Sequence, residues 1–136
     1  MTVVVDTNVV VSAAFWPTSE DRRCFVALAR RKHRLAVTEV VLREYRALAV
    51  RIGRREFPER HPAPFLDWIE RTGHLVTPAP LGKQRSRDVK DDPFLACGLA
   101  AQAEFIVTKD RDLLALDKPF GIKMVTPREF YRELES

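Results

Sequence analysis

Short apolar runs alternate along this chain with segments of helical periodicity, and this alternation most constrains the fold. The β-branched run Thr2–Val5 ends abruptly at the acid Asp6. A continuous apolar run of this length is typical of a strand buried on both faces. Further strands are expected at residues 35–37, 74–77, Phe105–Val107 and 122–125. The order predicts an α/β fold with a central parallel sheet covered by helices on both faces.

Capping residues mark where several of the helices should begin. The expected starts lie at Ser19, Thr38, Asp92 and Thr126. Asp92 is expected to be an N-cap with Pro93 as the first helical residue. Thr126 and Glu129 have the spacing of a capping box. Residues 78–87 are the best loop candidate, and no shift in composition marks a boundary, so residues 1–136 are expected to form one domain.

Composition excludes several classes of protein. The apolar runs are far shorter than the about 20 residues that a membrane span needs, and Asp6 comes too early for a secretory signal. Two cysteines, Cys24 and Cys97, cannot build a disulfide framework, which favours a reduced, cytoplasmic setting. With 23 Lys and Arg against 19 Asp and Glu, the formal net charge is +4. This balance permits nucleic-acid binding without establishing it.

Several acids are expected at the carboxyl edge of the sheet, where open α/β proteins bind their ligands. Asp6 directly follows the first strand, and Asp110 follows Phe105–Val107. Asp92 opens a helix and, taken alone, is more often a cap than a ligand. Glu44 lies one and a half turns into its helix, too far along to act as a cap.

Carboxylates that meet in one pocket repel one another and stay ionised together only beside a cation. Mg²⁺ and Mn²⁺ prefer oxygen ligands of this kind. Such an ion could activate water and stabilise charge on a phosphate, while nearby Lys and Arg side chains hold a polyanion. The chain has no Ser–His–Asp or Cys–His set and no glycine-rich phosphate loop that would favour other chemistry.

Four segments resemble the sequence motifs of PIN-domain nucleases and occur in the same order. They are Val3-Val4-Val5-Asp6-Thr7-Asn8-Val9, Thr38-Glu39-Val40-Val41-Leu42-Arg43-Glu44, Asp91-Asp92-Pro93-Phe94-Leu95-Ala96-Cys97 and Ile106-Val107-Thr108-Lys109-Asp110-Arg111-Asp112-Leu113-Leu114. Each motif alone is weak evidence, but four in this order and at these spacings are strong evidence. Within the family, the chain is similar to the stand-alone toxins of toxin–antitoxin systems, the VapC type.

The resemblance implies a three-layer, Rossmann-like fold and metal-dependent hydrolysis of RNA phosphodiester bonds, with Mg²⁺ or Mn²⁺ as the cofactor. It also implies a homodimer, and inhibition by a small antitoxin whose tail enters the acidic pocket. The residues that it assigns to metal binding and catalysis are Asp6, Glu44, Asp92 and Asp110. Further candidates are Asp112, Asp91 as a substitute for Asp92, and Asn8 and Thr108, which would orient ligands or water.

Basic residues near the expected site are candidates for RNA contact. Arg43 and Arg46 flank Glu44 on its helix and are expected to contact phosphate or an acid of the antitoxin. Clusters at 30–34 and 83–90 could follow an RNA backbone, although a charge run is usually a solvated surface. Phe15 and Trp16 are expected in the pocket, in a dimer interface or in the core.

Two other functions fit parts of the pattern. A catalytically inactive PIN-fold protein would bind RNA or an antitoxin, and a lack of divalent-ion binding would favour it. A phosphoacceptor receiver domain also has a parallel sheet with acids at its strand ends. It needs paired acids directly after the first strand, where this chain has only Asp6.

Overall fold

Five parallel strands form one sheet in the order β3-β2-β1-β4-β5. The computed structural model describes residues 1–83 and 85–135. The strands are β1 Thr2–Val5, β2 Arg34–Val37, β3 His74–Leu75, β4 Phe105–Val107 and β5 Lys123–Val125. All five strands expected from the sequence are present, and β3 is two residues shorter than expected. The order differs from the 2-1-3-4-5 order of receiver domains, so that alternative is wrong.

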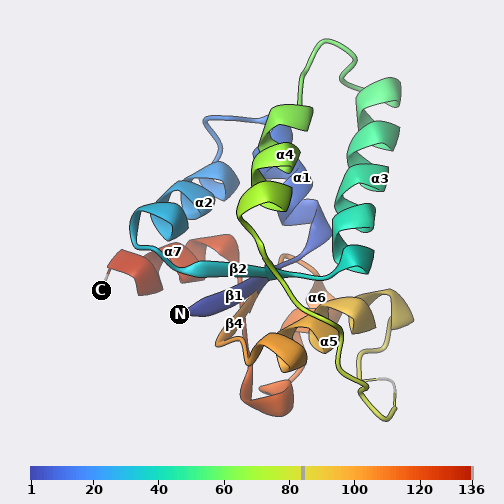
Figure 1. The fold of residues 1–136 in the computed structure, drawn as a ribbon, viewed down its shortest axis with the longest axis vertical. Helices are drawn as coiled ribbons and strands as arrows, with labels where there is room; N and C mark the ends of the chain where they lie inside the picture. The colour runs from blue at the N-terminus through green and yellow to red at the C-terminus, as the bar shows by residue number, and fades with distance from the viewer. Residues whose placement is uncertain (84, 136) are drawn as a thin grey trace.

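Helices cover both faces of this sheet. They are α1 Thr7–Phe15, α2 Glu20–Arg30, α3 Glu39–Arg55, α4 Ala63–Thr72, α5 Asp92–Ala101, α6 Arg111–Leu114 and α7 Pro127–Glu135, with 3₁₀ turns η1 Val89–Asp91 and η2 Pro119–Gly121. In Figure 1, α1 to α4 stand above the sheet and α5 lies below it. This is the expected α/β architecture. No helix in the described part of the chain has the length and apolar character of a membrane span.

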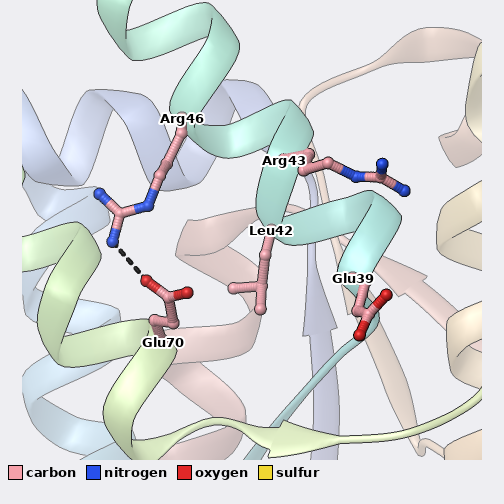
Figure 2. A pocket seen from close by; sticks show the side chains of 5 residues that line it. All are labelled: Glu39, Leu42, Arg43, Arg46 and Glu70. Atoms are coloured by element: carbon pink, nitrogen blue, oxygen red, sulfur yellow. Dashed lines mark hydrogen bonds and ion pairs between the residues drawn. The ribbon is translucent and has the colours of Figure 1, made fainter.

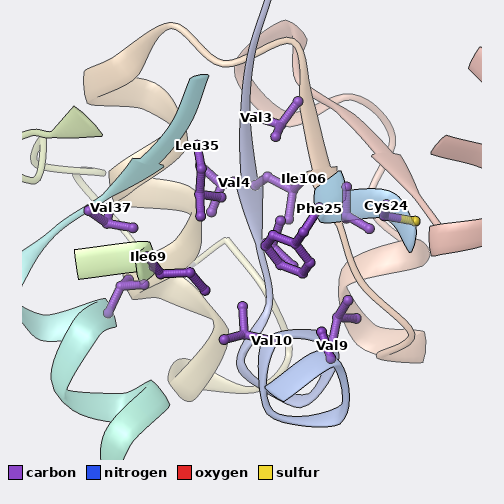
Figure 3. Packing of buried hydrophobic residues seen from close by; sticks show 14 of the residues in the cluster. Val3, Val4, Val9, Val10, Cys24, Phe25, Leu35, Val37, Ile69 and Ile106 are labelled. Atoms are coloured by element: carbon purple, nitrogen blue, oxygen red, sulfur yellow. The ribbon is translucent and has the colours of Figure 1, made fainter. Parts of the chain in front are cut away.

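The hydrophobic core surrounds β1, the middle strand. Val3 and Val4 have no exposed surface, and neither has Ile106 on the adjoining strand β4. Figure 3 shows Phe25 of α2 and Ile69 of α4 among the side chains gathered around these strands. Cys24 and Cys97 are also buried and free, as small hydrophobic residues. The apolar run that predicted a buried strand therefore lies at the centre of the molecule.

Three of the expected helix caps form. The hydroxyls of Ser19 and Thr38 each accept an N–H from the first turn of their helix at 3.1 Å. Thr126 and Glu129 make the reciprocal capping box, with N···O distances of 3.2 and 3.0 Å. Local sequence therefore decides where α2, α3 and α7 begin.

The start of α5 differs from the prediction. The helix begins at Asp92 itself, Pro93 is its second residue, and Asp91 in the capping position makes no side-chain cap bond. The turn η1 runs directly into α5, and Asp88 caps that turn by accepting the N–H of Lys90 at 3.0 Å. Gly98 lets the helix lie close to the sheet, because a Cβ there would come within 2.9 Å of the Ile122 side chain.

Helix α1 has no counterpart in the sequence prediction. Its central residues, Val9, Val10 and Val11, are β-branched and have weak helix propensity. All three are buried, so tertiary packing outweighs the local preference. The Oδ1 atom of Asp6 accepts the N–H of Thr7 at 2.8 Å and caps the helix. The chain thus turns from β1 into α1 at the carboxyl edge of the sheet.

Candidate metal centre

Strands β1 and β4 lie side by side, and between them the strand order reverses, which is where open α/β sheets bind ligands. Asp6 follows β1, and its N–H donates to the carbonyl of Val107 at the end of β4. The Thr108 hydroxyl, on the next residue of that strand end, donates to Asp6 Oδ2 at 2.7 Å. Both side chains are buried. The sheet register therefore joins two motifs that lie 102 residues apart.

Thr108 also fixes the turn that follows β4. Its Oγ1 accepts the N–H of Asp110 at 2.9 Å, and Asp110 Oδ1 accepts the N–H of Asp112 at 2.8 Å. The second bond caps α6. These bonds orient the half-buried carboxylate of Asp110 and fix the backbone at Asp112.

Asp91 reaches the same place from the turn η1. Its carboxylate is 5% exposed and accepts the Ser86 hydroxyl at 2.8 Å. One carboxylate oxygen from each of Asp91, Asp110 and Asp112 lies within 4.8 Å of the others. The structure thus brings together three acids from two segments of the chain, and Asp110 and Asp91 are both near enough to Asp6 to interact with its charge.

Glu44 approaches Asp6 from α3. The buried hydroxyl of the next residue, Tyr45, donates to the carbonyl of Val5 at 2.6 Å and fixes α3 against the end of β1. Burial, followed by the negative charge of Asp6, raises the pKa of the half-buried Glu44 carboxyl. Glu44 therefore interacts with the charge of Asp6, although it lies outside the three converging acids.

The acids perturb one another electrostatically. Burial raises the pKa of Asp6, the Thr108 hydrogen bond partly offsets this, and the charge of Asp110 adds to it. Burial raises the pKa of Asp91 to about 6, where the Ser86 bond opposes the shift and Asp110 and Asp6 reinforce it. The arrangement therefore stores mutual repulsion that a bound cation would relieve.

The donor set fits a hard divalent cation. All the converging atoms are carboxylate oxygens, the ligand type that Mg²⁺ and Mn²⁺ prefer. Two ligands at about 2.1 Å on opposite sides of an ion lie about 4.2 Å apart. The 4.8 Å limit on the separations among Asp91, Asp110 and Asp112 is close to this span. Small side-chain movements would let these three residues share an ion.

Asp91, expected only as a substitute for Asp92, belongs to the group of three acids. The structure does not bring Asp92 into the group of three, and its half-buried side chain keeps Oδ1 without a hydrogen-bond partner in the described part of the chain. Asn8 is exposed on the first turn of α1. Sequence reasoning missed Ser86, because a serine inside a basic loop carries no signal that a buried acid needs it.

Arg46 has local partners on α4. Its Nη2 lies 2.8 Å from Asp67 and 2.5 Å from Glu70, so its charge is already neutralised there. Figure 2 shows Arg46 directed toward Glu70, whereas Arg43 points the other way from the same helix. Of the two arginines, the exposed Arg43 is therefore the one left to meet a phosphate.

The two basic clusters lie at different edges of the sheet. Cluster 30–34 joins the end of α2 to the start of β2, which is the edge opposite the acids. Cluster 83–90, in which Gln84 lies outside the described residues, leads into α5, and Arg87 contacts Asp112 at 3.2 Å. Of the two clusters, 83–90 is therefore the one that adjoins the acids.

Phe15 and Trp16 do not line the group of acids. Phe15 is buried in the core, and the half-buried Trp16 packs edge-on against Phe57, with ring centroids 4.8 Å apart.

Comparisons with known proteins agree with this architecture. Residues 2–112 match the PIN domain family. The fold is similar to the crystal structure of PAE2754 from Pyrobaculum aerophilum, with TM-score 0.66 and 16% identity over 100% of this chain and 91% of that chain. It is also similar to VapBC2 from Rickettsia felis bound to a DNA fragment from their promoter, with TM-score 0.64 and 15% identity over 93% of this chain and 98% of that chain. No curated protein sequence matches the chain significantly. The family match spans all four motifs up to Asp112, and the chain therefore belongs to the PIN domain family.

Proposed function

We propose that this protein is a metal-dependent endoribonuclease that hydrolyses RNA phosphodiester bonds, and that it is the toxin of a toxin–antitoxin system. PIN domains are generally nucleases, which sets the class of reaction. The observation that carries the proposal is the convergence of Asp91, Asp110 and Asp112 beside the buried Asp6. A protein that only binds RNA has no need to hold repelling carboxylates together.

We assign different roles to the acids: four would bind the metal ion, and Glu44 would accept a proton. Asp6, Asp91, Asp110 and Asp112 would hold one or more Mg²⁺ or Mn²⁺ ions, which would lower the pKa of water and stabilise negative charge on the phosphate. Thr108 keeps Asp6 and Asp110 in fixed orientations through its two hydrogen bonds. The raised pKa of the Glu44 carboxyl suits it to accept a proton from the attacking water.

The surface around the acids suits a polyanionic substrate. Because the acids are concentrated at one edge, the rest of the chain is more basic than its net charge of +4 indicates. Arg43 is exposed on α3, and Arg87 contacts Asp112 at the start of α6. These side chains would hold RNA phosphates while the acids bind the cation.

An antitoxin partner, a homodimer and a cytoplasmic location belong to the same proposal. The similar Rickettsia felis structure is a VapBC2 complex. In this chain, a groove of about 460 Å³ between α2 and α4 is lined by the exposed Val26, the half-buried Trp68 and the buried rings of Phe25 and Phe65, between Arg22 and Arg30. An apolar groove with basic margins supports binding of a protein partner that has an acidic, amphipathic segment.

Cleavage of labelled single-stranded and structured RNA by the purified protein tests the proposal. We expect cleavage with Mg²⁺ or Mn²⁺, none with EDTA, and at least a 100-fold loss in Asp6→Asn, because the buried carboxylate is lost. Asp117→Asn removes the same charge from an exposed site and should cleave normally. Undiminished cleavage by Asp6→Asn would refute the assignment. Binding of RNA without cleavage by the metal-loaded protein would identify the inactive alternative.

A further inference from the structure

Asp21 is a buried acid that lies outside the group of acids described above. It lies in the first turn of α2, and its side chain is 3% exposed. The positive end of the helix dipole favours a negative charge at this position. A carboxylate removed from water nevertheless needs a close partner, because burial without one is costly.

Lys109 supplies that partner from the metal centre. Its Nζ atom lies 2.8 Å from Asp21 Oδ2, and it is the one cation within salt-bridge distance of Asp21 in the described part of the chain. Lys109 stands between Thr108, which holds Asp6, and Asp110, which belongs to the converging acids. The ion pair therefore joins α2 to the turn that carries the acids.

We propose that Lys109 is a positioning residue, which through Asp21 holds the turn 108–112 in the conformation that binds the metal ion. This inference rests on the proposed function. The anchor is rigid, because Cys24, Phe25 and Leu28 fix α2 in the core. Any movement of the turn that withdraws Lys109 leaves Asp21 unpaired in the interior, so the pair opposes that movement.

The direction of the change in Mn²⁺ affinity on loss of Lys109 distinguishes a positioning role from a purely electrostatic effect of its charge. Lys109 is cationic and adjoins the metal centre in sequence, so its charge alone would weaken cation binding. Removal of that charge would then tighten Mn²⁺ binding. Loss of the anchor would instead loosen Asp110 and weaken Mn²⁺ binding. The two explanations therefore predict opposite changes in Mn²⁺ affinity.

Lys109→Met is the informative variant, because methionine keeps an unbranched side chain without charge. We expect about tenfold weaker Mn²⁺ binding by isothermal titration calorimetry. In the metal-free protein we also expect faster amide exchange at Asp110 and Asp112, whose N–H groups bond within the turn. Lys123→Met breaks an exposed pair with Glu133 and serves as the matched control, with neither change expected.

A double variant distinguishes positioning from stability alone. Asp21→Asn with Lys109→Met removes the unpaired buried charge, so it should recover much of the thermal stability that Lys109→Met loses. Mn²⁺ affinity and turn protection should stay low, because the anchor is still missing. Lys109→Arg keeps a cation of similar reach and should retain both properties.

Each outcome has a separate meaning. Unchanged or tighter Mn²⁺ binding in Lys109→Met overturns the inference, as does recovery of Mn²⁺ affinity in the double variant. Failure of the unaltered protein to bind Mn²⁺ overturns the proposed function instead. In that case, amide exchange in the metal-free protein still decides whether Lys109 holds the turn.

Discussion

Asp6 and Asp110 follow directly from the ends of β1 and β4, whereas Asp91 and Asp112 depend on a loop and a four-residue helix. We call Asp6, Thr108 and Asp110 the strand side, and Ser86, Arg87, Asp91 and Asp112 the loop side. On the strand side, the buried Thr108 makes two hydrogen bonds that join the acids. On the loop side, Ser86 donates to Asp91 and accepts the N–H of Asp88 at 3.4 Å, and Arg87 contacts Asp112. The strand side is fixed by the sheet, and the loop side by side-chain contacts within residues 86–91 and from Arg87 to α6.

The difference shows how a metal centre of this kind can combine rigidity with adjustment. Parallel pairing of β1 and β4 sets the positions of Asp6 and Thr108 before any ion binds. Asp91 has a pKa raised to about 6 and Asp112 is paired with an exposed arginine, so a bound cation would deprotonate the first and compete with the arginine for the second. We therefore expect the strand side to define where the ion binds and the loop side to adapt to it.

The largest difference is expected between substitutions of the two neighbouring acids, Asp91 and Asp92. Asp91→Asn should weaken Mn²⁺ binding about 100-fold, because it removes a carboxylate that converges with two others. Asp92→Asn is the matched neighbour and should change the affinity less than about threefold, because Asp92 lies outside the three and, in contrast to Asp6, is not among the charges that raise the pKa of Asp91. Calorimetric titration of both variants measures this. A larger loss in Asp92→Asn would restore the original sequence prediction and reverse the assignment.

Loss of a hydroxyl should harm the strand side more than the loop side. Thr108→Val leaves both a buried oxygen of Asp6 and the N–H of Asp110 unpaired, so the free energy of unfolding should fall by about 3 kcal/mol. Ser86→Ala removes the 2.8 Å bond to Asp91 and the longer, 3.4 Å bond from the half-buried Asp88, and should cost about 1 kcal/mol. Urea unfolding in EDTA compares the two. An equal or greater loss in Ser86→Ala would contradict the distinction.

The metal-free protein should lose stability as the pH rises from about 4 to about 6. The pKa of the Asp91 carboxyl is about 6 in the folded chain and 3.8 in the unfolded chain. In this pH range the folded state therefore binds more protons than the unfolded state. Deprotonation then favours unfolding, by about 2 kcal/mol. Asp6 and Glu44, whose pKa values are also raised, act in the same direction. Thermal unfolding in EDTA should show a weaker slope in Asp91→Asn, and an unchanged slope would contradict this.

Arg87→Ala should have the smallest effect. Its ion pair with Asp112 joins a side chain that is 78% exposed to one that is 36% exposed. Such pairs contribute less than about 1 kcal/mol, so the unfolding free energy should barely change. Mn²⁺ binding should tighten slightly, because the guanidinium no longer competes for Asp112. A loss of stability above 1 kcal/mol would show that the loop side is held more firmly than we infer.

Sequence patterns predicted the parts that short-range physics controls. The strand positions, the caps of α2, α3 and α7, and the placement of Asp6 and Asp110 behind β1 and β4 all agree with the structure. Each depends on the identity of a few neighbouring residues. The strand side could therefore be predicted almost completely.

The remaining features depend on contacts between distant segments. Asp91 and Asp92 are adjacent carboxylates, and the phase of the turn η1 decides which of them faces Asp110. The valines of α1 favour a strand locally and become helical only through burial. Arg46 has the spacing of a phosphate ligand, but its acidic partners lie on another helix. Local patterns hold no information on any of these three outcomes.

A crystal grown or soaked with Mn²⁺, with anomalous scattering recorded at the manganese edge, tests the central claim most directly. We predict a peak at the carboxyl edge between β1 and β4, within about 2.2 Å of carboxylate oxygens of Asp91 and Asp110. Asp6 should border the same peak, and Asp92 should not contact it. A peak held by Asp92 in place of Asp91 would contradict the assignment, and no peak at this edge would contradict the metal centre itself.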